Sequence, residues 1–478
     1  MEWALDVPNP AGPEMNRQQP AQPYAITERP NHRHCPALLV LYTLLLCLCS
    51  LTYGQTPEAP SADPRRLRVA DESGVVTVGR QYGPVDSRLV LLPDGRIASF
   101  ARPVYTEDPF QPVPIDSLRD RLSKGEYKDF KVEQTDHYLI FYQCSEEFAQ
   151  NSARLLESLY KKLIEKFQER GFAVADSEFP LVAIIFRSEE DFRRHREVDS
   201  EVQAYYEIMS NRIFFYETSE RQLEDAQFAA MRKPQTVTHE GTHQILQNMG
   251  VQPRLAAWPP WLVEGMAELA AASERKNGEW VQFSQVNPLH IATLEDLRDT
   301  QFLQGNTPAS TRVEVGRAAG TSMVEYLISK TSLTPTDYSL SWALTHYLAN
   351  KQTPAFLNYL KEMSQLPPGV SRTAQENQAL FVRHFGSKFR QIDSQVEKHL
   401  AKLRSQTNLV YYGVVFEQPL PGNRLRRGTL VSRSPQVIRE WVTDKMPDPQ
   451  GGSYRWQATE FRTRLDAVQA TENWISGN

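Results

Sequence analysis

The segment from His239 to Glu268, HEGTHQILQNMGVQPRLAAWPPWLVEGMAE, decides how the rest of the chain is interpreted. It opens with an HExxH pattern, in which His239 and His243 are four residues apart. Residues at this spacing on a helix lie one turn apart on one face, so both imidazoles can reach a single metal ion. Glu240 lies beside them and can polarise a water molecule bound to that ion. The motif therefore predicts a metal-binding helix.

Helix-breaking residues place this motif at the start of a pair of helices. Pro234 and Thr236 supply a helix start, and Gly250 supplies a stop. The prolines Pro259 and Pro260 then interrupt the chain before the apolar run WLVEGMAE. We therefore expect one helix that begins near Pro234 and ends at Gly250, and a second helix directly after the two prolines.

The second helix supplies two carboxylates at helical spacing. Glu264 is a suitable third zinc ligand, which gives two neutral imidazoles, one carboxylate and an open fourth position. Glu268 lies one turn further on the same face, where it can hold a ligand histidine by its other ring nitrogen. We expect one zinc ion bound by His239, His243 and Glu264, with Glu268 supporting the ligands.

The combination of HEGTH and WLVEGMAE resembles the gluzincin metallopeptidases, whose zinc site is HExxH plus a glutamate on a following helix. Within that group the chain is similar to the peptidase-MA-like domains of exported bacterial proteins, many of them uncharacterised. The resemblance covers about Asp136 to Arg404 and is specific at the metal site. It implies an α+β fold like that of thermolysin and the aminopeptidases, with a mixed sheet and active-site helices followed by an all-helical half.

Local sequence patterns agree with that order of elements. His137–Tyr142 and the apolar run Leu181–Phe186 are expected strands, and Glu146–Glu169 is an amphipathic helix that stops at Gly171. Further helices are predicted by apolar residues at helical spacing in Thr311–Lys330, Thr336–Lys351, Pro354–Ser364, Arg372–Phe385 and Lys388–Ser405.

A hairpin is expected where Gln203–Tyr206 and Arg212–Tyr216 flank Ser210 and Asn211. In gluzincins an antiparallel edge strand lies beside the zinc helix, and the substrate backbone adds to it as a further strand. By resemblance, one arm of this hairpin is our candidate for that edge. The alternative is an ordinary hairpin packed by its aromatic residues.

The resemblance also implies a tyrosine that assists the metal ion at the oxyanion of the tetrahedral intermediate. In aminopeptidase-like gluzincins this residue lies near the start of a helix, some distance after the glutamate ligand. Tyr338 fits by order and local context, with Asp337 or Thr336 as the helix cap. Tyr347 and Tyr326 are rivals, and a tyrosine that only packs the helix start is the alternative.

The remaining reactive side chains give no further motif. His290, His346, His384 and His399 stand singly, and each is expected to be a packed or solvated helix residue rather than a ligand. Cys144 follows an apolar run and is expected to be a buried small hydrophobe rather than a nucleophile. The sequence contains no GxSxG elbow, phosphate-binding loop or dinucleotide-binding glycine pattern.

The first 54 residues predict export from the cell. Residues 1–35 are polar and proline-rich, and we expect them to stay unfolded. Residues 36–54 form an apolar segment with a basic flank and a small-x-small end, which is typical of a cleaved secretory signal. An uncleaved membrane anchor at residues 37–53 is the alternative. The leader holds every cysteine except Cys144, so the mature chain cannot form an internal disulfide.

A chain of 478 residues is long enough for several domains. We expect, in order, a leader (1–35), a signal segment (36–54), a linker (55–66), a small β unit with a hairpin (67–110), the metallopeptidase-like domain (111–405) and a small α/β module (406–478). The last module is predicted as strand, helix, strand, helix.

The net charge of -5 gives no broad basic surface, which argues against nucleic acid as a partner.

These observations together predict an exported zinc metallopeptidase that acts on a peptide or protein substrate. Glu240 would take the proton from the attacking water and deliver it to the leaving amine. Two alternatives remain, namely a binding or scaffold protein that keeps zinc without turnover, and a zinc amidase acting on cell-wall peptides. The intact Glu240 argues against the first alternative, because a structural zinc site does not need this residue.

Overall fold

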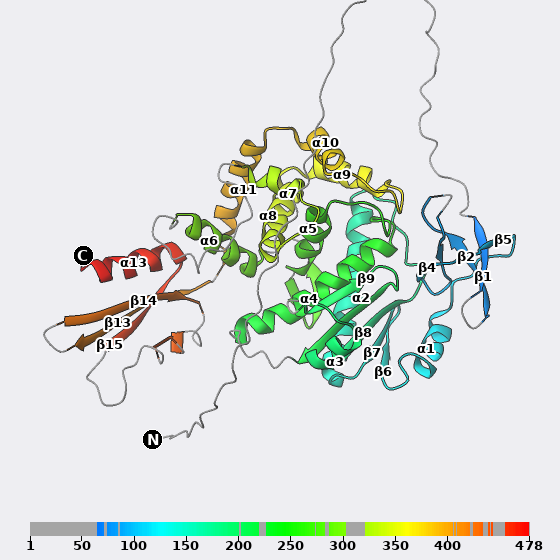
Figure 1. Cartoon of the computed structure of the whole chain (residues 1–478), viewed down its shortest axis with the longest axis horizontal. Helices are drawn as coiled ribbons and strands as arrows, with labels where there is room; N and C mark the ends of the chain where they lie inside the picture. The colour runs from blue at the N-terminus through cyan, green and yellow to red at the C-terminus, as the bar shows by residue number, and fades with distance from the viewer. Residues whose placement is uncertain are drawn as a thin grey trace, which may run out of the picture. The chain divides into compact units, whose positions relative to one another are not determined.

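The computed structural model describes residues 65–70, 74–84, 87–199, 202–218, 226–272, 274–282, 286–302, 321–404, 406–407, 409–420, 424–433, 438–439, 441–442 and 455–477. These residues form an α+β protein, as the sequence predicts, with several separate sheets (Figure 1). The predicted leader, the signal segment and nearly all of the predicted linker lie outside them. Within the described ranges, no helix is long and apolar enough to span a lipid bilayer.

The N-terminal β unit is an antiparallel sheet with the strand order β4-β3-β2-β1-β5. Its strands are β1 (Arg66–Ala70), β2 (Val76–Gln81), β3 (Leu89–Leu91), β4 (Ile97–Ser99) and β5 (Val104–Tyr105). Strands β3 and β4 are the predicted hairpin, and Gly95 at its turn has a φ of 83°, which glycine adopts without strain. Leu91 and Ile97 pack with Phe179, so the unit shares an apolar cluster with the next sheet.

The central sheet is mixed, with the strand order β6-β7-β8-β10-β9. Its strands are β6 (Lys131–Gln134), β7 (Tyr138–Tyr142), β8 (Leu181–Ser188), β9 (Ala204–Glu207) and β10 (Arg212–Thr218). Strands β7, β8 and β10 run parallel, whereas β6 and β9 are antiparallel strands at the two edges. The hairpin prediction is confirmed, and β9 is the arm that lies at the edge of the described sheet.

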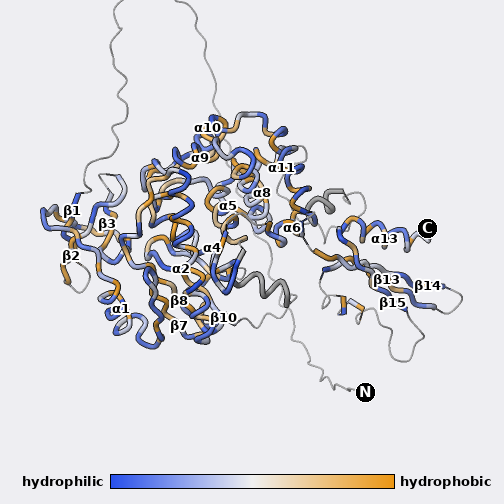
Figure 2. The backbone as a smooth tube through the Cα atoms, turned by 180° about the vertical axis from the view of Figure 1, so that it is seen from behind, coloured by the Kyte–Doolittle hydropathy of each residue, from blue (hydrophilic) through white to orange (hydrophobic). Residues whose placement is uncertain are grey.

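Both faces of the central sheet are covered, which is why its inner strands are continuously apolar (Figure 2). Residues of β7 alternate between two apolar clusters. Tyr138 and Ile140 pack on the side of α2 (Glu146–Glu169), whereas Leu139 and Phe141 pack on the side of α1 (Ile115–Lys124) and α3 (Glu189–His195). Helix α2 has the predicted bounds, because Ser145 caps its start and its apolar residues form one stripe.

The helix that carries HExxH is longer than predicted. Helix α4 (Ala226–Asn248) begins before Pro234, which lies inside it, so the expected start at Pro234 and Thr236 is wrong. An internal proline removes one backbone hydrogen bond, and packing against α2 and the sheet outweighs that local cost. Gly241 allows the close approach, because a Cβ atom there would lie 2.6 Å from a methyl carbon of Leu156 in α2. Helix α5 (Pro260–Ala271) confirms the predicted second helix, although it starts one residue earlier than expected and includes Pro260.

A hairpin and an all-helical region follow. The elements are β11 (Glu274–Lys276), β12 (Glu279–Gln282), α6 (Pro288–Phe302), α7 (Met323–Ile328), α8 (Pro335–Lys351), α9 (Thr353–Ser364), α10 (Ala374–Phe385) and α11 (Phe389–Arg404). The predictions for α8 to α11 are confirmed with small shifts at the ends. Helix α7 confirms a later part of the helix predicted at Thr311–Lys330, but its cap at Ser322 shows that the helix does not run through residues 321–322. The predicted start at Thr311 lies outside the described ranges.

The C-terminal module contains a sheet with the order β14-β13-β15 and a final helix. Its elements are β13 (Tyr411–Leu420), β14 (Arg424–Ser432), β15 (Arg455–Phe461) and α13 (Arg464–Ser476). Strand β14 was not predicted, because its sequence RLRRGTLVS begins with charged and exposed residues that hide a strand pattern. The hydroxyl of Tyr411 donates to the buried carboxylate of Glu295 in α6 at 2.6 Å, which ties this module to the helical region.

Candidate metal centre

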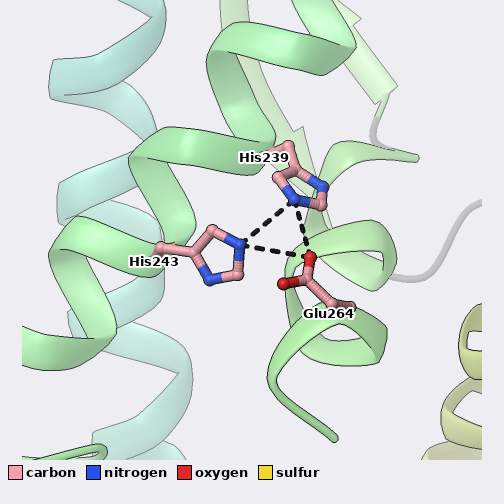
Figure 3. A group of neighbouring side chains, drawn as sticks. All are labelled: His239, His243 and Glu264. Atoms are coloured by element: carbon pink, nitrogen blue, oxygen red, sulfur yellow. Dashed lines mark hydrogen bonds and ion pairs between the residues drawn. The ribbon is translucent and has the colours of Figure 1, made fainter. Parts of the chain in front are cut away.

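Three side chains from two helices converge on one point. His239 and His243 project from α4, and Glu264 projects from α5 (Figure 3). His239 Nε2 lies 3.1 Å from His243 Nε2 and 3.1 Å from Glu264 Oε2. His243 Nε2 lies 3.4 Å from the same carboxylate oxygen. The three atoms therefore form a nearly equilateral triangle.

This triangle has the size that a tetrahedral zinc site requires. Zinc binds histidine nitrogen and carboxylate oxygen at about 2.0–2.1 Å, which places tetrahedral ligand atoms about 3.3 Å apart. The observed separations of 3.1 to 3.4 Å agree with that spacing. Two imidazole nitrogens and a carboxylate oxygen are also the donor types that zinc prefers. The residues present therefore fit one zinc ion, with a fourth position open.

Glu268 contacts the ring nitrogen of His239 that is not part of the triangle. Its Oε1 lies 3.2 Å from His239 Nδ1, on the opposite side of the ring from Nε2. An ionised carboxylate only accepts hydrogen bonds, so a neutral His239 carries its proton on Nδ1. The lone pair of Nε2 is then directed at the triangle, as a metal ligand needs.

The charges of these groups stabilise one another inside the protein. Burial by itself would raise the pKa of Glu264, but His243 and His239 lower it to about 2. Burial likewise opposes ionisation of Glu268, yet His290 and His239 hold its pKa well below the usual range. Burial would lower the pKa of His239, but Glu268, Glu264 and Glu240 raise it well above 6.5. The carboxylates of the site therefore favour positive charge at its histidines.

Glu240 differs from the other carboxylates of the site. Burial is the largest cause that raises its pKa, with Glu264 adding to the rise while His239 and His243 oppose it. The backbone of Tyr206 in the edge strand β9 also opposes the rise in this pKa. A carboxylate with a raised pKa is a better base, and Glu240 is close to the triangle without being part of it.

Tyr338 lies beside the metal centre. Its ring centroid is 6.3 Å from that of His239. Burial, followed by the charges of Glu264, Glu240 and Glu268, raises the pKa of Tyr338, so its hydroxyl stays protonated and can donate.

The rival tyrosines have partners elsewhere. The hydroxyl of Tyr347 donates to Gln395 at 2.6 Å, and that of Tyr326 accepts from Lys330 at 3.0 Å.

The cap of α8 is Thr334, whose N–H and hydroxyl donate to Asp337 at 2.8 and 2.9 Å. Asp337 thus takes part in the cap, whereas the expectation of Thr336 as the cap is wrong.

Two residues of the site were missed by sequence reasoning. His290 on α6 lies with its Nε2 2.8 Å from Glu268 Oε2, and its Nδ1 lies 2.9 Å from the hydroxyl of Ser339 on α8. His290 is packed, as expected, but it does not stand singly. Its role becomes visible only through its contact with Glu268, which lies on another helix. No local sequence pattern predicts that contact.

The other reactive side chains lie outside the triangle. His346 Nδ1 and His399 Nε2 are 2.8 Å apart, so the expectation that these histidines stand singly is wrong. His384 Nε2 lies 2.7 Å from Glu362, and it is a packed helix residue as expected. Cys144 is only partly buried, and burial together with Glu217 raises the pKa of its thiol to about 12, which makes it a poor nucleophile.

Comparison with known proteins adds one finding. A family model described as "Protein of unknown function (DUF1570)" matches residues 233–369 of the chain. This segment contains every residue of the triangle together with Glu268, His290 and Tyr338. No curated protein matches the chain.

Proposed function

We propose that this protein is a zinc-dependent metallopeptidase of the gluzincin type, exported from the cell, that hydrolyses peptide bonds. The observation that supports the proposal most directly is the triangle of His239 Nε2, His243 Nε2 and Glu264 Oε2, with sides of 3.1 to 3.4 Å. A zinc ion held there would supply a Lewis acid that polarises the substrate carbonyl and activates water.

The side chains around the triangle then have separate tasks. Glu240, with its raised pKa, takes the proton of the attacking water and later delivers it to the leaving amine. The protonated hydroxyl of Tyr338 donates to the oxyanion that forms at the substrate carbonyl. Glu268 keeps His239 in the tautomer and orientation that bind the ion.

The edge strand β9 offers a place for the substrate backbone. Glu207 directs its carbonyl toward the turn of the hairpin, where it accepts from Asn211 N–H at 2.8 Å. Neighbouring residues in an antiparallel strand alternate in direction, so Tyr206 and Ala204 direct their backbone groups away from β10, to the edge that no other described strand pairs with. The interaction of the Tyr206 backbone with Glu240 supports this assignment. A peptide added to β9 would therefore pass next to the general base.

The decisive experiment is a peptide-library digest by the purified protein. Cleavage should occur with the zinc-loaded protein, stop after chelation and return when zinc is restored. The Glu240→Gln variant should be inactive throughout. Zinc binding without any cleavage would instead favour the scaffold protein, and cleavage only of cell-wall peptides would favour the amidase.

A further inference from the structure

Four helices are joined by one line of hydrogen-bonding side chains that starts at the metal centre. The line runs from His239 on α4 through Glu268 on α5 and His290 on α6 to Ser339 on α8. Its three separations are 3.2, 2.8 and 2.9 Å. The side chains of Glu268 and His290 are 15% and 11% exposed, so water reaches them poorly and each polar atom depends on its protein partner.

The direction of each hydrogen bond follows from the chemistry of Glu268. Both of its oxygens are occupied, Oε1 by His239 Nδ1 and Oε2 by His290 Nε2. Since an ionised carboxylate only accepts, both histidines donate to it. A neutral His290 then has a lone pair on Nδ1, which accepts from the hydroxyl of Ser339. His290 is thus held at both ring nitrogens and can fix the carboxylate in one orientation.

We propose that His290 is a positioning residue of the metal centre, which holds the Glu268 carboxylate in the orientation that presents His239 Nε2 to the ion. This inference rests on the proposed zinc site. The Glu268 carboxylate lies 2.8 Å from His290 Nε2 and 3.2 Å from His239 Nδ1. A shorter distance to His290 is expected if His290 fixes the carboxylate and the carboxylate then orients His239.

The same residue connects the ligands to the helix of the candidate oxyanion donor. Ser339 directly follows Tyr338 in the first turns of α8, and its side chain is buried. The ring of His290 also packs against Trp342 one turn further on, with ring centroids 5.3 Å apart. His290 therefore fixes the start of α8 relative to α5, so it positions Tyr338 as well as Glu268.

The test measures zinc affinity by competition with a chelator, and it needs no substrate. His290→Phe keeps the ring volume but removes both hydrogen bonds, and it should weaken zinc binding about tenfold, at the lower end of the range for groups that support ligands. His290→Gln keeps one donor and one acceptor, and it should recover most of that loss. In the Glu268→Ala background, His290→Phe should cause no further loss, because its effect passes through Glu268.

The controls separate positioning from general destabilisation. His346→Phe removes another buried histidine, on α8, and should leave zinc affinity unchanged. With cobalt(II) in place of zinc, His290→Phe and Glu268→Ala should change the visible absorption spectrum in the same way. His290→Leu replaces His290→Phe if the latter does not fold, as judged by Tm.

Two results would overturn the inference, and a third would reject the site itself. Wild-type zinc affinity in His290→Phe, or an equal loss with and without Glu268, shows that His290 does not act through the carboxylate. A wild-type protein that binds no zinc instead rejects the proposed function, so the two failures are distinguishable.

Discussion

The protein contains two groups of buried histidines that differ in their charged neighbours. His239 in the metal centre is surrounded by Glu268, Glu264 and Glu240, and together they raise its pKa well above 6.5 despite burial. His399 in the helical region contacts His346 at 2.8 Å, and burial together with Lys351 and Lys402 lowers its pKa. Two histidines in similarly buried positions therefore prefer opposite charge states.

This comparison shows why His239 is a better candidate metal ligand than His399. Burial alone disfavours positive charge, whether it is carried by a proton or by a metal ion. The carboxylates of α5 reverse that preference at His239, while Lys351 and Lys402 reinforce it at His399. The carboxylates around His239, and not its burial, therefore make it the candidate ligand of the two.

The largest expected effect comes from removing one histidine of each group. His243→Ala should reduce the metal content from about one zinc per chain to background, since two ligands do not hold the ion. His399→Ala should keep the full zinc content. Elemental analysis after dialysis measures both, and equal zinc content in the two variants would refute the distinction between the groups.

Glu240→Gln should abolish hydrolysis while zinc content and Tm stay unchanged. The amide is nearly isosteric but cannot accept a proton, so water activation and leaving-group protonation both fail. We expect a loss of kcat on the order of 10³-fold or more. Digestion of the peptide library measures it, and substantial residual turnover would move the general base to another residue.

Tyr338→Phe should lower kcat by about ten- to a thousandfold, the range for one oxyanion donor. Zinc content and KM should change little, because the lost bond forms mainly in the transition state. Tyr347→Phe is the matched control, since its hydroxyl bonds to Gln395 instead. A full kcat in Tyr338→Phe together with a loss in Tyr347→Phe would reverse the assignment.

Glu268→Ala should weaken zinc affinity by about ten- to a hundredfold without abolishing binding. The variant leaves the three ligands in place but frees the ring of His239. Titration with zinc against a chelator distinguishes this partial loss from the complete loss in His243→Ala. An unchanged affinity would show that Glu268 is a structural residue only.

The smallest effect, counted per pH unit, is the pH dependence of zinc binding. The raised pKa of His239 means that a proton competes with the ion until the pH passes that pKa, so affinity should rise with pH. The increase should reach about tenfold per pH unit for one displaced proton. His399 has a lowered pKa and should leave this slope unchanged when replaced by alanine. Competition titrations between about pH 6 and about pH 9 measure the slope, and a flat profile would contradict the raised pKa.

Helices and strands whose ends are set by residues within or next to the element were predicted well from the sequence. Helix α2 has the predicted bounds, because a serine cap, an apolar stripe and Gly171 all lie within the segment itself. The start of α4 was predicted wrongly for the opposite reason. Pro234 is a local helix breaker, and only the packing of α4 against α2 and the sheet explains why the helix continues through it.

The candidate ligands could be identified from the amino-acid sequence alone, since the spacing of His239 and His243 and the position of Glu264 in a following helix are short-range properties. The side chains that support these ligands, in contrast, are known only from the way the helices pack. His290 is 22 residues from Glu268 and 49 residues from Ser339, and no local pattern encodes contacts at such separations. The physical reason is that helical periodicity fixes which residues share a face, whereas the packing of four helices fixes which faces meet.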